Sequence, residues 1–309
     1  MIVKERRKPD QMLALEALQR RANLRRDEIE KDLLLARAGF RGEEALNYHL
    51  QQIPPHSHIL HDIRFAVDEL FVQLDTLLLA DNFITIIEVK NFTGTLTFDE
   101  ERHQMIRTLD GKEEAFLDPL LQVRRQKNYL RKWLNAHQYT ELPIETLIVI
   151  SKPSTIIHTS NPSVIHSAYL PFKINELESK YAQRVLGQNE LLRMGEELKQ
   201  AHVPRKIDLL QKYKIKKEEL RVGVHCSSCS TLPMLRGYGK WKCTYCGYVS
   251  ADAHIESLRD YRLLVEESIT NRELRWFLQI DSERIARSII QSLNPVGKTK
   301  GRRYRLDFL

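Results

Sequence analysis

The sequence predicts a mixed α/β protein, with an α/β or α+β sandwich over about residues 37–200 and smaller modules after it. The first observation is a series of strand-like segments rich in Ile, Val, Thr and Phe, at 59–66, 70–80, 83–91 and 94–99. The second is the continuous apolar run 146–151, which is typical of a fully buried strand. The third is an amphipathic helix between them, expected at about 119–136.

The segments before the strands are expected to be helical. Residues 10–36 contain no Gly or Pro and predict one long helix, which dominates an N-terminal segment 1–36. Gly39 and Gly42 follow it. A second, shorter helix is then expected at Glu43–Leu50, because two prolines follow at 54 and 55.

The segment after the apolar run, 155–220, is expected to flank the sandwich. It contains a short strand at Val164–His166 and a polar helix at about 176–201. A charged linker around Lys212–Lys217 then leads into the C-terminal modules.

Composition excludes several protein classes. The chain has 309 residues, of which 42% are hydrophobic and 29% charged, as in an ordinary globular protein. No apolar run approaches the roughly 20 residues that a membrane span needs. The first eight residues lack the apolar region of a signal peptide, so we expect a cytoplasmic protein that does not enter a membrane.

Charge is distributed unevenly along the chain. The net charge is +7; residues 201–309 carry 21 Lys and Arg against 12 Asp and Glu, and residues 1–200 are close to neutral. A basic C-terminal third indicates attraction to nucleic acid or another polyanion. The alternative is a solvated basic surface with no such partner.

The cysteines predict a metal site. The chain has only four, in two C-x2-C pairs separated by thirteen residues: Cys226, Cys229, Cys243 and Cys246. This spacing is typical of a structural Zn²⁺ site with four thiolate ligands, and it resembles a zinc ribbon, here expected at 221–250. Gly247 fits a tight turn that needs a positive φ. Disulfides are the alternative, which a cytoplasmic location disfavours.

One predicted hairpin contains residues that could bind a metal ion or take part in catalysis. If Asp81-Asn82 forms a two-residue turn, Ala80 pairs with Phe83 and Asp75 lies opposite Glu88. Two facing carboxylates repel each other, but they could hold a divalent cation such as Mg²⁺. Lys90 shares their face and could serve an attacking water. A different loop length would shift this register, and a simple ion pair between Glu88 and Lys90 on an edge strand is the alternative.

These residues belong to an ordered set of motifs: Gly39-x-x-Gly42-Glu43, then Asp75, then Ile-Glu88-Val-Lys90-Asn91 with Gly94, then Pro119-x-x-Gln122. The set resembles the NERD (nuclease-related) domain over about residues 37–154. That family looks like a branch of the PD-(D/E)xK superfamily, so the resemblance implies a restriction-endonuclease-like fold. The tryptophan often seen after the Gly94-type position is absent, and Phe98 and Met105 are nearby instead, a departure that concerns packing more than chemistry.

The resemblance also implies roles for individual residues. Asp75 and Glu88 would bind Mg²⁺ or Mn²⁺, and Lys90 would be the catalytic lysine. Glu43 would help to order the metal site, and Gln122 would place a polar side chain near the scissile phosphate. Glu44 is an alternative to Glu43, whose position near a helix start also complements the helix dipole. A helix surface is mostly polar, so Gln122 could instead simply face solvent.

The last segment, 251–309, predicts two short helices followed by a basic hairpin. Thr270-x-x-Glu273 is a capping box that opens the first helix, and Asp281-Ser282 opens the second. This order resembles a winged helix-turn-helix, a module that binds DNA or, alternatively, proteins. The candidate nucleic-acid contacts are its outward basic residues: Arg284, Arg287, Lys298, Lys300, Arg302, Arg303 and Arg305.

Together these features predict a metal-dependent nuclease that hydrolyses phosphodiester bonds in DNA and binds nucleic acid through its C-terminal modules. One alternative is a catalytically inactive accessory factor with a nuclease-like fold, acting in DNA binding or processing. Another is a zinc-stabilised scaffold that binds only proteins.

Overall fold

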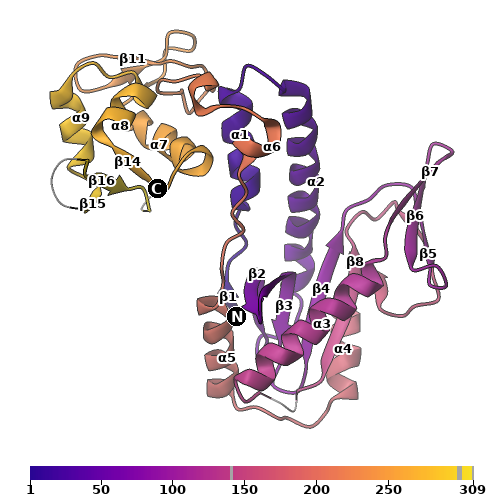
Figure 1. Ribbon diagram of the computed structural model, residues 1–309. Helices are drawn as coiled ribbons and strands as arrows, with labels where there is room; N and C mark the ends of the chain where they lie inside the picture. Colours follow the sequence, from indigo (N-terminus) through magenta and orange to yellow (C-terminus); the bar gives the residue numbers. More distant parts are fainter. Residues whose placement is uncertain (140–141, 298–300, 308–309) are drawn as a thin grey trace. The chain divides into compact units, whose positions relative to one another are not determined.

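The computed structural model describes residues 1–139, 142–297 and 301–307 (Figure 1). The chain forms two compact units. The first unit comprises 1–9 and 36–205, and the second comprises 10–35 and 206–309.

A six-stranded mixed sheet forms the centre of the first unit, in the order β1-β2-β3-β4-β8-β10. Its strands are β1 (Ile2–Lys4), β2 (His58–Val67), β3 (Leu70–Leu79), β4 (Ile84–Lys90), β8 (Ile144–Ile150) and β10 (Val164–His166). Strands β2, β3 and β4 are antiparallel neighbours, whereas β4, β8 and β10 run parallel. Their long apolar runs fit strands covered on both faces, which confirms the predicted mixed α/β class.

The register of the β3–β4 hairpin is as predicted. Leu79 pairs with Ile84 and Thr76 pairs with Ile87, while the Ala80 N–H donates to the Phe83 carbonyl at 2.9 Å. The two-residue turn at 81–82 therefore determines which residues face each other further along the hairpin.

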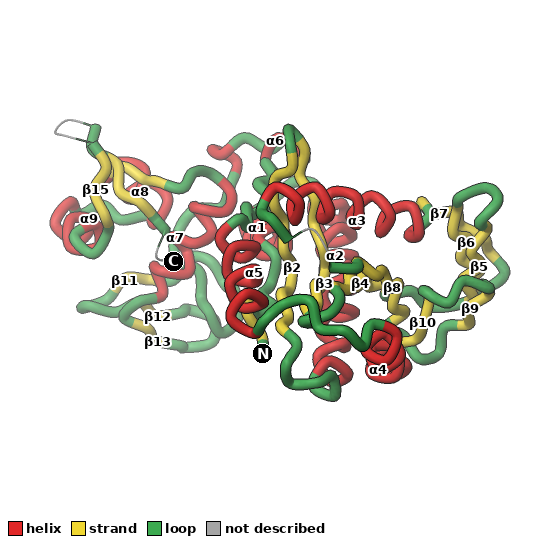
Figure 2. The backbone as a smooth tube through the Cα atoms, turned by 90° about the horizontal axis from the view of Figure 1, so that it is seen from below, coloured by secondary structure: helices red, strands yellow, loops and turns green. Residues whose placement is uncertain are grey.

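Helices cover both faces of this sheet. On one face, α3 (Pro119–Ala136) and α5 (Gln188–Gln200) bury residues such as Leu130 and Leu191 in one apolar cluster with β2 and β3. On the other, the C-terminal half of α2 (Arg26–Leu50) and α4 (Leu170–Lys180) pack on a second cluster. Figure 2 shows α3 and α4 on opposite sides of the strands. The arrangement is a helix–sheet–helix sandwich.

A second sheet lies beside the sandwich in the order β7-β6-β5-β9. Its strands are β5 (Thr95–Asp99), β6 (Gln104–Leu109), β7 (Lys112–Leu117) and β9 (Ile156–His158). Phe98 and Met105, which stand near the missing tryptophan position, are register partners and both are buried. They fill the core beneath this sheet together with Val123 of α3.

Two helix predictions were wrong. The expected single helix 10–36 is instead α1 (Asp10–Arg21) followed, after a turn with Arg25 at φ 57°, by α2, which runs on through Gly39 and Gly42. Both glycines therefore lie inside helix α2, and neither ends a helix. The expected helix at 176–201 is likewise two helices, α4 and α5, separated by an irregular segment.

In the second unit, the cysteine-rich segment and the C-terminal helices share a core. The remaining elements of this unit are α6 (Leu209–Tyr213), a 3-10 turn (Lys217–Glu219), β11 (Leu235–Arg236), β12 (Trp241–Lys242), β13 (Val249–Ser250), α7 (Ala253–Leu264), β14 (Ser268–Thr270), α8 (Asn271–Leu278), α9 (Glu283–Ile290), β15 (Asn294–Val296) and β16 (Arg303–Arg305). Cys226 and Trp241 pack in the same buried cluster as Phe277 and Leu306. The cysteine-rich segment and the C-terminal helices thus stabilise each other.

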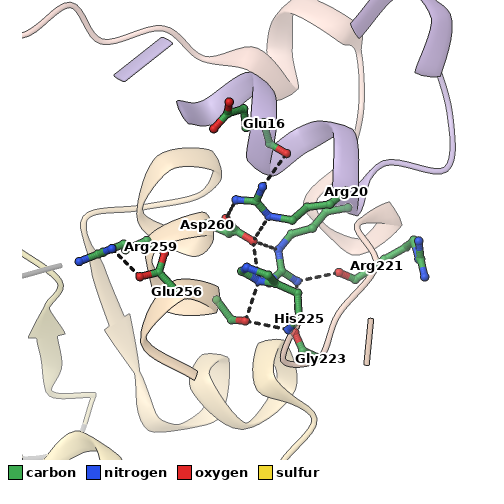
Figure 3. A network of polar contacts seen from close by, with 10 residues as sticks. Glu16, Arg20, Arg221, Gly223, His225, Glu256, Arg259 and Asp260 are labelled. Carbon is green, nitrogen blue, oxygen red and sulfur yellow. Dashed lines mark hydrogen bonds and ion pairs between the residues drawn. The ribbon is translucent and has the colours of Figure 1, made fainter. Parts of the chain in front are cut away.

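A buried ion network joins α1 to α7 inside the second unit (Figure 3). Asp260 of α7 accepts hydrogen bonds from Arg20 at 2.6 Å and from Arg21 at 2.7 Å, and its side chain is only 1% exposed. Arg21 also donates to the backbone carbonyls of Arg221 and Gly223. The N-terminal helix α1 is therefore an integral part of the C-terminal unit.

Candidate active site and metal centre

The two predicted carboxylates lie near each other on the central sheet. The β3–β4 register, continued by one residue, sets Asp75 opposite Glu88. Asp75 Oδ2 accepts a hydrogen bond from the Val89 N–H at 2.9 Å, and Glu88 is buried, with 4% of its side chain exposed. The hairpin thus brings both carboxylates to one region of β3 and β4.

Lys90 connects this region to helix α3. Its Nζ donates to Glu88 Oε1 at 2.7 Å and to Gln122 Oε1 at 3.0 Å. Gln122, whose position on the solvent face was an open alternative, therefore points to the strand and contacts the predicted lysine.

The sequence interpretation missed a second glutamine on the same helix. Gln126 is buried, and its Nε2 donates to Glu88 Oε2 at 2.9 Å and to the Gln73 carbonyl at 3.0 Å. It lies four residues after Gln122, the spacing that puts two side chains on one face of a helix. Once Gln122 is assigned to the site, that spacing is the signal that could have found Gln126.

Glu43 approaches from helix α2, and a residue of the N-terminal segment holds it there. The buried Arg6 guanidinium donates to Glu43 Oε2 at 2.6 Å and to Thr76 Oγ1 at 3.1 Å. Glu44, the alternative, is exposed. Arg6 was not among the predicted residues, because no local pattern connects position 6 to position 43.

Burial and neighbouring carboxylates raise the pKa values of Asp75 and Glu43. Burial, followed by the negative charges of Glu88 and Glu43, raises the pKa of Asp75 well above its usual value. Burial raises the pKa of Glu43 to about 7, although the neighbouring Arg6 opposes this shift. Excess negative charge in a partly buried place is the electrostatic environment that a bound cation relieves.

The donor chemistry of this region fits Mg²⁺ or Mn²⁺. Carboxylate oxygens are hard ligands, and Mg²⁺ commonly takes one or two of them while it keeps several waters. Asp75 and Glu88 are the residues that would hold the ion. Glu43 is hydrogen-bonded to Arg6 and would not be a direct ligand. It would contribute negative charge and help to order the site.

This region lies within a segment that matches a known family. Residues 38–151 match the family model described as NERD, nuclease-related domain. The chain contains a NERD domain. No curated protein and no solved structure gave a significant match to the chain. The match spans all five candidate residues from Glu43 to Gln122, whereas Arg6 lies outside it.

The predicted four-cysteine cluster lies outside the NERD domain and is confirmed. The four Sγ atoms all lie within 4.8 Å of one another, with Cys226–Cys246 and Cys229–Cys243 each at 3.6 Å. Four sulfurs at about 2.3 Å from a tetrahedral Zn²⁺ would be roughly 3.8 Å apart, so the geometry fits a structural zinc. All four cysteines are free, and the separations are too long for the roughly 2.05 Å of a disulfide. Gly247 has the expected positive φ, 73°.

The C-terminal basic residues differ in their surroundings. Arg284, Arg302 and Arg305 are exposed, and Arg287 is exposed but paired with Glu283 at 3.2 Å. Arg303 is half-buried and binds Glu266 and Ser268 within the unit. The remaining two candidates, Lys298 and Lys300, lie outside the described residues.

Helices α8 and α9 begin as the sequence predicts. Thr270 and Glu273 form the capping box, and Ser282 caps α9 through the Ile285 N–H. The order α7, β14, α8, α9, β15, β16, with β16 central in its sheet, is consistent with the expected pair of helices and hairpin. Among the helices in the described part of the chain, none is both long enough and apolar enough to span a membrane.

Proposed function

We propose that the protein is a metal-dependent nuclease that hydrolyses phosphodiester bonds in DNA. The observation that carries the proposal is Lys90, held by Glu88 on one side and by Gln122 on the other, beside Asp75 in a NERD domain. An ion pair on a sheet needs no glutamine from a separate helix and no second carboxylate facing it. In a metal-dependent hydrolytic site, the second carboxylate would help to hold the cation and the glutamine would hold the lysine in place.

Each side chain has a defined task in this proposal. Asp75 and Glu88 hold Mg²⁺ or Mn²⁺, which when bound neutralises phosphate charge and lowers the pKa of a water. Lys90 orients the attacking water and stabilises the negative charge that develops on the phosphate. Gln122 fixes the Lys90 ammonium, and Gln126 fixes the second oxygen of Glu88.

Arg6 and Glu43 order the site from its other side. The Arg6 guanidinium donates to Glu43 and to Thr76, the residue next to Asp75. It therefore links α2 to β3 at the point where the first carboxylate stands. We assign Arg6 a positioning role, because it is buried and would contact no substrate.

The second unit supplies nucleic-acid affinity in this proposal. Its exposed Arg284, Arg302 and Arg305 would bind DNA phosphates, and α8, α9 and the following hairpin would form a winged helix. The zinc ion would have a structural role. Four cysteines kept as thiolates fit a reducing compartment, so the proposal places the protein in the cytoplasm.

A second candidate is an inactive accessory factor with the same fold. It is favoured by the pairing of both Glu88 oxygens, one with Lys90 and one with Gln126. A cation would have to share or displace these contacts. In this candidate the carboxylates and Lys90 serve stability alone.

A nuclease assay with matched variants tests the proposal. Single-stranded and duplex DNA, with blunt, recessed and nicked ends, and RNA are incubated with the protein with and without Mg²⁺. We expect cleavage that needs Mg²⁺ and is lost in Lys90→Ala, with unchanged folding and DNA binding, since a transition-state interaction affects turnover. Lys132→Ala, which removes an exposed lysine of the same domain, should cleave normally.

Asp75→Asn separates the metal role from the role of the lysine. An amide lacks the charge that a hard cation requires, so this variant should lose both cleavage and Mg²⁺ binding, measured by calorimetry. Lys90→Ala should lose only cleavage. Full activity of Lys90→Ala would show that this hairpin is not the active site, and inactivity of the unmodified protein on every substrate would favour the accessory factor.

A further inference from the structure

The cysteine-rich segment of the second unit has an unusual charge pattern. Between Glu219 and Asp252 there is no acidic residue, and the basic residues are Arg221, Arg236, Lys240 and Lys242. Even with the negative charge of a four-thiolate zinc site, the segment stays positive. Three of these four cations lie within seven residues around β12.

Tyrosines lie among and just after these cations, and their side chains are exposed to solvent. Tyr238 is fully exposed, Tyr245 is 81% exposed and Tyr248 is 43% exposed. Trp241, in the same segment, is by contrast buried in the core of the unit. Because Trp241 supplies the packing, the tyrosines are not needed to stabilise the fold.

The small sheet arranges these residues around one exposed face. In the antiparallel order β11-β12-β13, Leu235, Lys242 and Val249 are register partners, so their side chains share a face, and all three are exposed. The opposite side carries Trp241, with the Arg236 guanidinium 4.8 Å from its ring centroid. One side of the sheet is therefore anchored in the core and the other is open to solvent.

Two of the tyrosines stand at the two ends of this face. Tyr238 lies in the turn that precedes β12, which the Gly237 N–H closes on the Lys240 carbonyl at 2.8 Å. Tyr245 lies in the turn that follows β12, between Cys243 and Cys246. Successive turns of an antiparallel meander are at opposite ends of the shared strand. Each end of the open face is thus flanked by a turn that carries an exposed tyrosine, and Lys242 lies between the two turns.

We propose that this face binds single-stranded nucleic acid, with bases stacked on Tyr238 and Tyr245 and phosphates held by Lys240 and Lys242. The segment 220–251 contains basic residues and no side-chain carboxylate, which favours a polyanion as the partner over a protein of mixed charge. Exposed aromatic rings offer stacking surfaces to unpaired bases, whereas in a duplex the bases are already stacked on one another. The inference does not depend on the proposed nuclease activity, because it concerns binding by residues outside the NERD domain.

Fluorescence anisotropy of the full-length protein tests this inference. The probes are a labelled oligothymidine of about 15 nucleotides and a labelled duplex of equal length, in buffer without Mg²⁺ so that cleavage plays no part. Tyr238→Ala and Tyr245→Ala should each weaken binding of the single strand about tenfold, the effect typical of one lost base–aromatic stack. Both should leave duplex binding within twofold.

Further variants distinguish stacking from other effects. Tyr238→Phe and Tyr245→Phe keep the ring and should bind the single strand normally. Tyr48→Ala, which removes an exposed tyrosine of the first unit, is the matched control and should have no effect. Retained zinc in every variant shows that the segment is folded.

Three outcomes would overturn the inference. The first is an alanine variant with intact zinc that binds the single strand as tightly as the unmodified protein. The second is an equal loss for single strand and duplex, which would indicate a general electrostatic surface. The third is an equal loss in the phenylalanine variants, which would indicate hydrogen bonding by the hydroxyl groups.

Discussion

Replacing Asp260 by Asn should destabilise the second unit strongly. Asp260 is an acidic partner shared by two arginines from α1, and one of them, Arg21, is fully buried. Burial alone would raise the pKa of Asp260, but the charges of Arg21 and Arg20 lower it overall, so the carboxylate is ionised. The amide keeps the volume of the side chain and removes its charge.

The expected loss of stability follows from the Arg21 charge, which stays buried in the variant. In the Asp260→Asn variant the Arg21 guanidinium is left with neutral partners: the amide oxygen at position 260, the carbonyls of Arg221 and Gly223, and the Phe277 ring, 4.3 Å away. Removing one member of a buried ion pair costs about 3–5 kcal/mol. With a urea m-value of about 2 kcal/mol per M, the unfolding midpoint of this unit should fall by about 2 M.

Tryptophan fluorescence can follow the second unit by itself. Trp241 and Trp276 belong to this unit and Trp133 belongs to the first, so a Trp133→Phe background reports only on the second. The matched control is Glu256→Gln, on the same helix α7, whose partner Arg259 and carboxylate are both nearly half exposed (Figure 3). An exposed pair of this kind contributes about 0–1 kcal/mol. Equal midpoints for Asp260→Asn and Glu256→Gln would refute the conclusion that the network stabilises the unit.

Three further predictions concern other parts of the chain. Gly42→Ala should destabilise the first unit by about 1–3 kcal/mol in urea unfolding, because the added Cβ would lie 2.4 Å from Asn91 Cβ, whereas Gly39→Ala, with open space around it, should stabilise it by up to about 1 kcal/mol. Burial and the charges of Arg6 and Lys4 lower the pKa of His61 to about 3. As pH falls, His61 is therefore protonated in the unfolded chain before it is protonated in the folded protein. The free energy of unfolding should decrease as pH falls from about 6.5 towards 3. Between pH 7 and pH 5 the free energy of unfolding of the unmodified protein should fall by about 2 kcal/mol more than that of His61→Asn. Equal decreases in the two proteins would contradict the lowered pKa of His61. Purified protein should contain one Zn²⁺ per chain, and a chelator should unfold the second unit but not the first; absence of zinc, or a disulfide between the cysteines, would contradict the site.

The residues of the candidate site on β3 and β4 could be predicted because hairpin geometry is local. A period of two and a two-residue turn leave one register, and that register places Asp75, Glu88 and Lys90 relative to one another. The four cysteines could be predicted for a similar reason. Two short loops and one hairpin bring them together without any distant element.

The hairpin of β6 and β7 was missed although the sequence contains a signal for it. Asp110-Gly111 is a dipeptide typical of a type I′ turn, and both residues have positive φ, 51° and 74°. The strand pattern itself is weak. Strand β7 (Lys112–Leu117) is exposed along almost its whole length, so no alternation of apolar and polar residues marks it.

The partner of the N-terminal helix could not be predicted from sequence. An apolar stripe on residues 10–21 indicates that one face is buried, but not against what. The structure places its partner on α7, some 240 residues later, where Asp260 receives both arginines. Local periodicity contains no information about such a separation.

The candidate active site is larger than the segment that matches the NERD family. That segment begins at residue 38, yet strand β1 extends the sheet of the first unit, and Arg6 lies two residues after this strand. Arg6 contacts Glu43 on α2 and Thr76 beside Asp75, so it supports two of the three carboxylates at once. Its positive charge also partly offsets their repulsion in a place where burial raises the pKa values of Asp75 and Glu43. The carboxylates of the NERD domain thus depend on a residue that the family match does not include. The compact unit that contains the NERD domain therefore includes residues 1–9.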